Sequence, residues 1–152
     1  MEWCDVAVDF AGDGALRDIY IFGTTAREWQ AVYDAVRIAY RVKLRGWELP
    51  PEDVRQLLGR SETPLMNIDV GGLNIACHFF GEAEIEFDLV PNIVKSQVEL
   101  DHVCQFLVLI GRAAGKDAVL TMENWRDWVI LRYDSITGVI SHGSTEQYRS
   151  RG

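Results

Sequence analysis

The sequence is poor in the residues that carry covalent or metal chemistry. Its 152 residues include only three cysteines and three histidines. Cys4, Cys77 and Cys104 are odd in number, and their spacing matches neither a zinc knuckle nor a CxxC pair. All three occupy apolar positions of expected elements, so we expect buried thiols in a reducing, cytoplasmic compartment. Neither a bound metal nor a cofactor is expected.

Long apolar runs and common catalytic motifs are also missing. No stretch approaches the roughly 20 apolar residues that a membrane-spanning helix needs. The opening Met-Glu-Trp-Cys-Asp lacks the basic and apolar regions of a signal peptide, so we expect neither export nor a membrane partner. Phosphate-binding loops and GxSxG nucleophile motifs are absent. The sequence therefore favours a protein that is not an enzyme.

Basic residues are fewer than acidic ones. The formal net charge is −8 and the pI is near 4.8. Such a chain repels phosphate backbones, so nucleic-acid binding is not expected, whereas a basic protein partner would be attracted. Acidity is also a common way to stay soluble. The length fits one domain, which we expect over residues 1–141, with a polar, frayed tail over residues 142–152.

The hydrophobic pattern predicts an α+β fold. Neighbouring expected strands are joined by short turns, so the sheet should be mostly antiparallel, with helices packed on one face. Capping boxes, in which a serine or threonine precedes a glutamate by three residues, mark the starts of the two long helices. The expected strands cover residues 3–10, 16–22, 65–70, 73–80, 84–90, 118–122, 128–133 and 139–141, and the expected helices cover residues 25–46, 50–58 and 96–115.

The central strands can be registered from their turns. Gly71-Gly72 forms a two-residue hairpin turn. A three-residue turn over 81–83 then keeps one face apolar, whereas a two-residue turn would mix the faces. This register places His78 opposite Glu86. The side chains that it turns inward are Ile68, Ile75, Cys77, Phe79, Ile85 and Phe87.

The other face of these strands is rich in carboxylates. In the run from Glu84 to Asp88 every second residue is acidic. Neighbours on one face of a strand are roughly 7 Å apart, so these charges repel one another, and threonine or lysine would suit a solvated strand as well. The residues expected to bind a partner on this face are Asp69, Asn74, His78, Phe80, Glu84, Glu86 and Asp88.

Three interpretations of this face are open. It can be a solvated surface that only adds solubility. It can be a docking surface for a basic protein, with Phe80 as an aromatic anchor. Finally, His78 with Asp69, Glu86 and Asp88 can form the metal or acid–base site of a small hydrolase or metal-binding enzyme. Side chains at alternate positions along a strand diverge rather than converge on one point, which weighs against a metal or acid–base site.

Five further features of the sequence are the strings His78-Phe79-Phe80, Glu84-Ile85-Glu86-Phe87-Asp88, Val119-Leu120-Thr121-Met122-Glu123-Asn124 and Leu131-Arg132-Tyr133-Asp134, and the helix ending at 111–116. Together they resemble small bacterial immunity proteins of polymorphic-toxin systems. The resemblance implies a cytosolic antitoxin that binds and occludes a cognate toxin domain, and it supplies no catalytic residues. A housekeeping protein-interaction module is the other non-enzymatic alternative.

Overall fold

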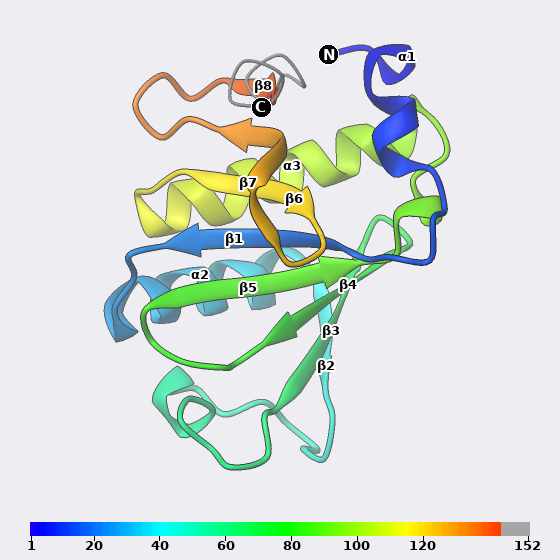
Figure 1. The fold of residues 1–152 in the computed structure, drawn as a ribbon. Coiled ribbons are helices and arrows are strands. Elements are labelled where there is room, and N and C mark those ends of the chain that lie inside the picture. The colour runs from blue at the N-terminus through cyan, green and yellow to red at the C-terminus, as the bar shows by residue number, and fades with distance from the viewer. Residues whose placement is uncertain (144–152) are drawn as a thin grey trace.

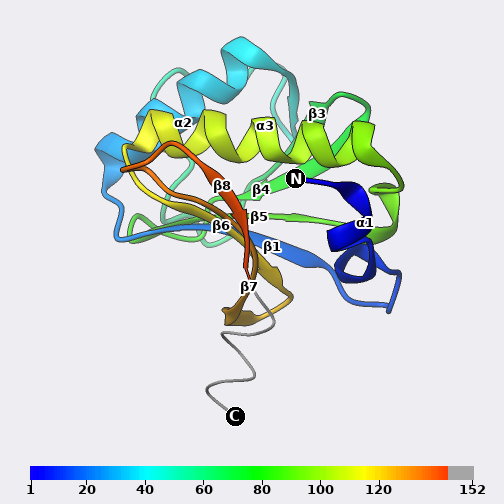
Figure 2. The same ribbon diagram turned by 90° about the horizontal axis from the view of Figure 1, so that it is seen from above.

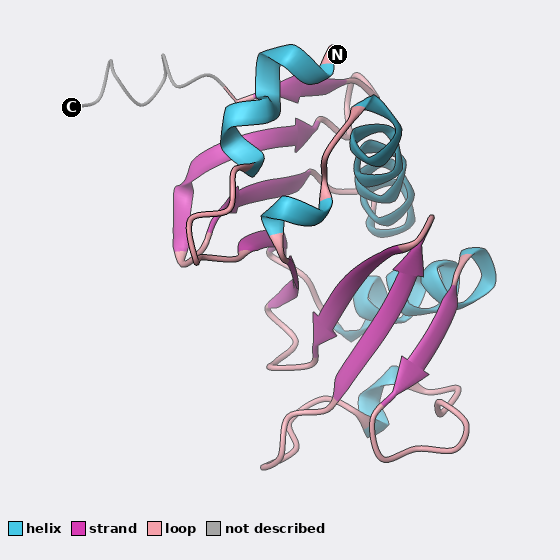
Figure 3. Cartoon of the chain, turned by 90° about the vertical axis from the view of Figure 1, so that its right-hand side faces the viewer, coloured by secondary structure: helices cyan, strands magenta, loops and turns pink. Residues whose placement is uncertain are grey.

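One antiparallel sheet of eight strands dominates residues 1–143, the part of the chain that the computed structural model describes (Figure 1). The strand order is β2-β3-β4-β5-β1-β6-β7-β8. The view in Figure 3 shows how strongly the sheet twists along this order. The strands are β1 (Arg17–Phe22), β2 (Arg41–Leu44), β3 (Leu65–Val70), β4 (Leu73–His78), β5 (Glu84–Leu89), β6 (Ala118–Met122), β7 (Trp125–Tyr133) and β8 (Ile140–His142).

Two long helices, α2 (Ala26–Ala39) and α3 (Gln97–Ala114), lie side by side over one face of the sheet (Figure 2). Both begin at the expected caps, because Thr25 and Ser96 accept hydrogen bonds from backbone N–H groups of the first turn. This arrangement confirms the predicted α+β fold with helices on one face. The shorter helical segments are α1 (Trp3–Val6), η1 (Ala7–Phe10), η2 (Val54–Gln56) and η3 (Pro91–Ile93).

The central hairpins have the predicted register. Gly71 and Gly72 both adopt positive φ angles, 60° and 91°, which a hairpin turn of this length requires. Ile68 pairs with Ile75 across β3 and β4, and His78 pairs with Glu86 across β4 and β5. The whole predicted inward set is buried against the helices: Ile68, Ile75, Cys77, Phe79, Ile85 and Phe87.

The predicted N-terminal strand over residues 3–10 is wrong, because the segment forms α1 and η1. Val6 and Phe10 are buried, and their spacing of four residues puts them on one side of a helix. Val8, which alternation would have turned inward with them, is 78% exposed. Cys4 is exposed as well, whereas Cys77 is buried and Cys104 half-buried, so only part of the cysteine prediction holds.

The helix predicted over residues 25–46 ends earlier, at Ala39. Residues Arg41–Leu44 instead form the edge strand β2, where Val42 pairs with Ile68 and Leu44 with Met66. Hydrogen bonding to β3 therefore outweighs the local helical pattern in this segment. The helix predicted over residues 50–58 shrinks to the single turn η2, capped by Asp53.

The C-terminal part of the described chain ends in β8. His142, expected in a frayed tail over 142–152, belongs to this strand, and its Nε2 lies 2.9 Å from Oδ2 of Asp9. Residues 144–152 of that predicted tail lie outside the described residues. Within residues 1–143, no helix combines the length and the apolar character that crossing a membrane demands.

Candidate functional site

The candidate site is the open face of the sheet, on the side away from α2 and α3, where β4, β5 and β1 run next to one another. The central strand β5 carries Glu84, Glu86 and Asp88 there. Across the three strands, His78 of β4 lies opposite Glu86 of β5, and Glu86 lies opposite Tyr20 of β1. We refer to the three β5 carboxylates as the acidic row.

All seven residues expected to bind a partner belong to this face, but they do not form one uniform cluster. Asp69 and Asn74 pair with each other next to the β3–β4 turn, apart from the acidic row. The Asp69 carboxylate accepts a hydrogen bond of 2.8 Å from the Gly72 N–H, so it stabilises the turn. Phe80 follows β4, is 57% exposed and stacks on the His78 ring at a centroid distance of 5.0 Å.

Strand β1 contributes three further side chains that the sequence analysis did not assign to the site. Asp18 lies opposite Asp88, Tyr20 opposite Glu86 and Phe22 opposite Glu84. Their alternation with Ile19 and Ile21 was visible in the sequence, and residues 16–22 were expected to form a strand. The pairing with β5 was not visible, because more than 60 residues separate Phe22 from Glu84.

The turn between β6 and β7 projects on the open side of the sheet (Figure 2). Asn124 adopts a positive φ of 57° in this turn, and its N–H donates a 2.8 Å hydrogen bond to Asp18. Asparagine tolerates this left-handed conformation better than most residues. Asp18 and Tyr20 are consequently almost completely buried, at 3% and 2% exposure, although they point away from the helices.

Two of the three carboxylates in the acidic row have cationic or potentially cationic partners within the chain. Arg126 forms a bidentate ion pair with Glu84, with 2.6 Å between its Nη2 and Oε1, and its guanidinium lies over the Tyr20 ring at 5.0 Å. Nε2 of His78 lies 2.6 Å from Oδ2 of Asp88. Neither of these two pairings was predicted from the sequence, which placed His78 only opposite Glu86.

Glu86 differs from its two neighbours in the row. No described residue donates a hydrogen bond to its carboxylate, which lies half-buried between His78 and Tyr20. Burial raises the pKa of Glu86, and the nearby charge of Asp18 adds to this effect. Burial also raises the pKa of Asp18, even though the Asn124 N–H and the Tyr20 hydroxyl stabilise its charged form. Negative charge is therefore concentrated where solvent compensates it poorly.

The hydrogen bond to Asp88 raises the pKa of His78, and the carboxylates of Glu86 and Asp18 act in the same direction. A histidine whose folded pKa lies above its unfolded value of 6.5 stabilises the fold below about pH 6.5, and this contribution is lost as pH rises through the folded pKa. The substitution His78→Gln should therefore cost about 1 kcal/mol near pH 5.5 and clearly less near pH 9, as measured by urea unfolding.

The matched control is His102→Gln, which removes a histidine from α3 on the helical side of the sheet. It leaves the contact between His78 and Asp88 intact, so its effect on stability should not follow the same pH dependence. A loss of stability in His78→Gln that is equal at both pH values would contradict the role given to the protonated imidazole.

Residues that could hold a metal do not converge on this face. Among residues 1–143, no three histidine, cysteine, aspartate or glutamate side chains are placed to ligate one ion. The three acids of β5 diverge along the strand, as the sequence pattern indicated.

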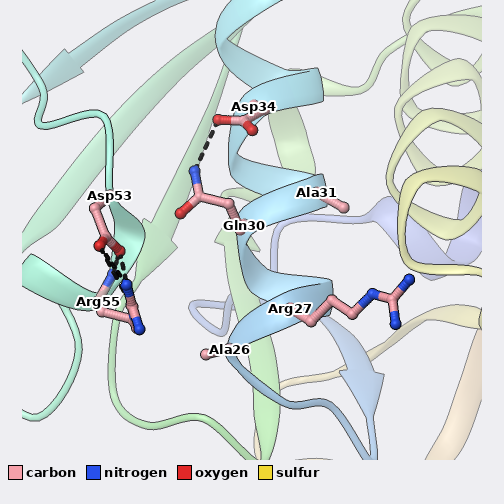
Figure 4. Close-up of a pocket in the computed structure, with 7 residues that line it drawn as sticks. All are labelled: Ala26, Arg27, Gln30, Ala31, Asp34, Asp53 and Arg55. Carbon is pink, nitrogen blue, oxygen red and sulfur yellow. Dashed lines mark hydrogen bonds and ion pairs between the residues drawn. The ribbon is translucent and has the colours of Figure 1, made fainter.

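A separate pocket lies on the outer side of α2 (Figure 4). Gln30 crosses it and binds both the Asp34 carboxylate and the backbone of residues 52–54. Asp53 and Arg55 pair with each other, while Arg27 points to the other side of the helix. Gln30 thus attaches the η2 segment to α2, and we assign this pocket a structural role.

Comparison of the chain with protein-family models, with curated proteins and with solved structures gave no match.

Proposed function

We propose that this protein is an immunity protein: it binds a basic protein partner, a cognate toxin domain, through the open face of its sheet and occludes the partner's active site. The observation that carries the proposal is the acidic row of β5 between the aromatic pairs of the two neighbouring strands, Tyr20 with Phe22 and His78 with Phe80. The face keeps more carboxylates than its internal partners neutralise, and this negative charge attracts a basic surface. The partly exposed rings of Phe22 and Phe80 provide apolar contact area, whereas Tyr20 is buried.

The internal ion pairs change how the proposal must be tested. Reversal of the acidic row to lysine would place like charges beside Arg126 and His78, and the fold itself would suffer. The amide variant Glu84→Gln/Glu86→Gln/Asp88→Asn removes the charges and keeps the shapes of the side chains. The matched control is Glu48→Gln/Glu52→Gln/Glu62→Gln, which changes the net charge equally at exposed positions outside the face.

The test uses the product of the gene adjacent to the one that encodes this protein. Co-expression of wild-type protein should relieve the growth defect that this product causes. In surface plasmon resonance, the amide variant should associate with the partner at least about tenfold more slowly, with a weaker dependence on salt, because electrostatic steering acts on the association rate. The control variant should stay within about threefold of wild type.

Two results would contradict the proposal. An adjacent gene product that is harmless and does not bind would remove the immunity function. Equal association rates and salt dependences for the amide variant, the control variant and the wild type would remove the open face as the docking surface. Circular dichroism of each variant establishes that a slower association does not reflect unfolding.

A further inference from the structure

The open face contains an excess of negative charge that can be located at one residue. Its carboxylates on β1 and β5 are Asp18, Glu84, Glu86 and Asp88, and the groups paired with them are Arg126 and His78. Negative charge therefore remains in excess even when His78 is protonated. Asp18 is buried and already accepts hydrogen bonds from the Tyr20 hydroxyl and the Asn124 N–H. Glu86 is the carboxylate that remains, and it is partly exposed.

Arg126 shows how this face holds a guanidinium group. It contacts the Glu84 carboxylate through two nitrogens and lies over the rings of Tyr20 and Phe22, at 5.0 and 5.4 Å from their centroids. These two rings are themselves stacked at 5.1 Å. A planar cation is thus bound by a carboxylate together with an aromatic pair on the adjacent strand, a combination that suits arginine better than lysine.

A related combination lies on the other side of β5, where Phe80 is the ring available to a cation and His78 supports it. Glu86 lies opposite His78 of β4, and the Phe80 ring stacks on the His78 ring with an interplanar angle of 0°. Phe80 is one of the most exposed aromatic side chains among the described residues. No described residue donates a hydrogen bond to the Glu86 carboxylate. A carboxylate and an aromatic pair are thus present without an arginine of the chain itself.

We propose that Glu86 and the Phe80–His78 ring pair bind an arginine side chain of the protein partner. This inference rests on the proposed function, since it specifies which basic residue the docking face recognises. The partner's guanidinium would pair with Glu86 and lie against Phe80, as Arg126 pairs with Glu84 and lies over Tyr20 and Phe22. The positive charge of the bound guanidinium also reduces the excess negative charge of this face.

The test uses blocked tetra-arginine and tetra-lysine peptides as probes, titrated into the full-length ¹⁵N-labelled protein at low salt, where exposed charges are least screened. The arginine peptide should shift the amide signals of β4 and β5 and bind at least about threefold more tightly than the lysine peptide. Glu86→Gln should weaken binding of the arginine peptide by about fivefold. Glu62→Gln, which removes the same charge from an exposed loop, should change it by less than about twofold.

A second variant separates the aromatic contribution from the charge. Phe80→Leu keeps an apolar side chain but removes the ring, so the preference for the arginine peptide over the lysine peptide should disappear. Equal binding of both peptides by wild-type protein, equal effects of Glu86→Gln and Glu62→Gln, or no shift in β4 and β5 would each overturn the inference. If Glu86→Gln binds the partner as wild type does while the triple amide variant associates slowly, the docking face stands and only the arginine site is wrong.

Discussion

Replacement of Trp29 by alanine is expected to lower the free energy of unfolding by about 3–5 kcal/mol. The indole is 1% exposed and stacks on Phe79 with 5.3 Å between the ring centroids. Its Nε1–H donates a 2.9 Å hydrogen bond to the backbone oxygen of Gly81. Truncation removes this large apolar contact, leaves a cavity between α2 and the sheet, and takes the hydrogen bond away from the β4–β5 connection.

The control for this prediction is Trp29→Phe, which keeps an aromatic ring and loses the hydrogen bond to Gly81. It should cost about 1–2 kcal/mol, because the apolar volume is largely retained. Chemical denaturation followed by circular dichroism measures both variants. Similar losses for phenylalanine and alanine would show that the hydrogen bond dominates, and a loss below about 1 kcal/mol for alanine would contradict the assigned packing. Because Gly81 follows Phe80, the same contact helps to place the proposed arginine-binding ring.

The second large effect is expected for Arg17→Met, with a loss of about 2–4 kcal/mol. Arg17 is 1% exposed, although it is charged. Its guanidinium donates hydrogen bonds to the backbone oxygens of Asp9 and Ala11, at 2.8 and 3.3 Å, and to the Asp13 carboxylate. Methionine keeps much of the apolar stem but leaves these carbonyl groups without their donor, so the N-terminal segment should detach from β1.

Asp13→Asn is the appropriate control because the Asp13 side chain is 43% exposed and water can replace part of what it loses. Its effect on the denaturation midpoint should be clearly smaller than that of Arg17→Met. Hydrogen exchange adds a local measurement, since the amide of Ala11 should lose protection in Arg17→Met. An unchanged midpoint together with unchanged exchange in this segment would contradict the role of the guanidinium.

The sequence by itself determined the hairpins between residues 65 and 89. Gly71-Gly72 fixes a two-residue turn, and a slip of one residue would have moved the whole apolar set to solvent. The starts of the two long helices were equally predictable, because their caps and their apolar stripes lie within one contiguous segment, whereas the end of α2 was not. Local sequence patterns were therefore sufficient to assign His78, Phe80 and the acidic row to the correct face of the sheet.

Segments with a short or ambiguous pattern were decided by tertiary structure. Residues 3–10 satisfy both an alternating and a helical arrangement of apolar side chains, and burial of Val6 and Phe10 selects the helix. Residues Arg41–Leu44 continue the helical pattern of α2, yet pairing with β3 selects a strand. In both segments a contact with a distant part of the chain outweighs a weak local preference.

The composition of the open face was also decided only by the tertiary structure. Strand β1 inserts between β5 and β6, which brings Asp18 and Tyr20 beside carboxylates far away in the sequence. The β6–β7 turn then places Arg126 on Glu84. No local pattern encodes such pairings, because they depend on which strands meet when the common apolar face is buried against α2 and α3. The sequence determined which side chains point away from the core, and the strand order determined which charged groups lie next to them.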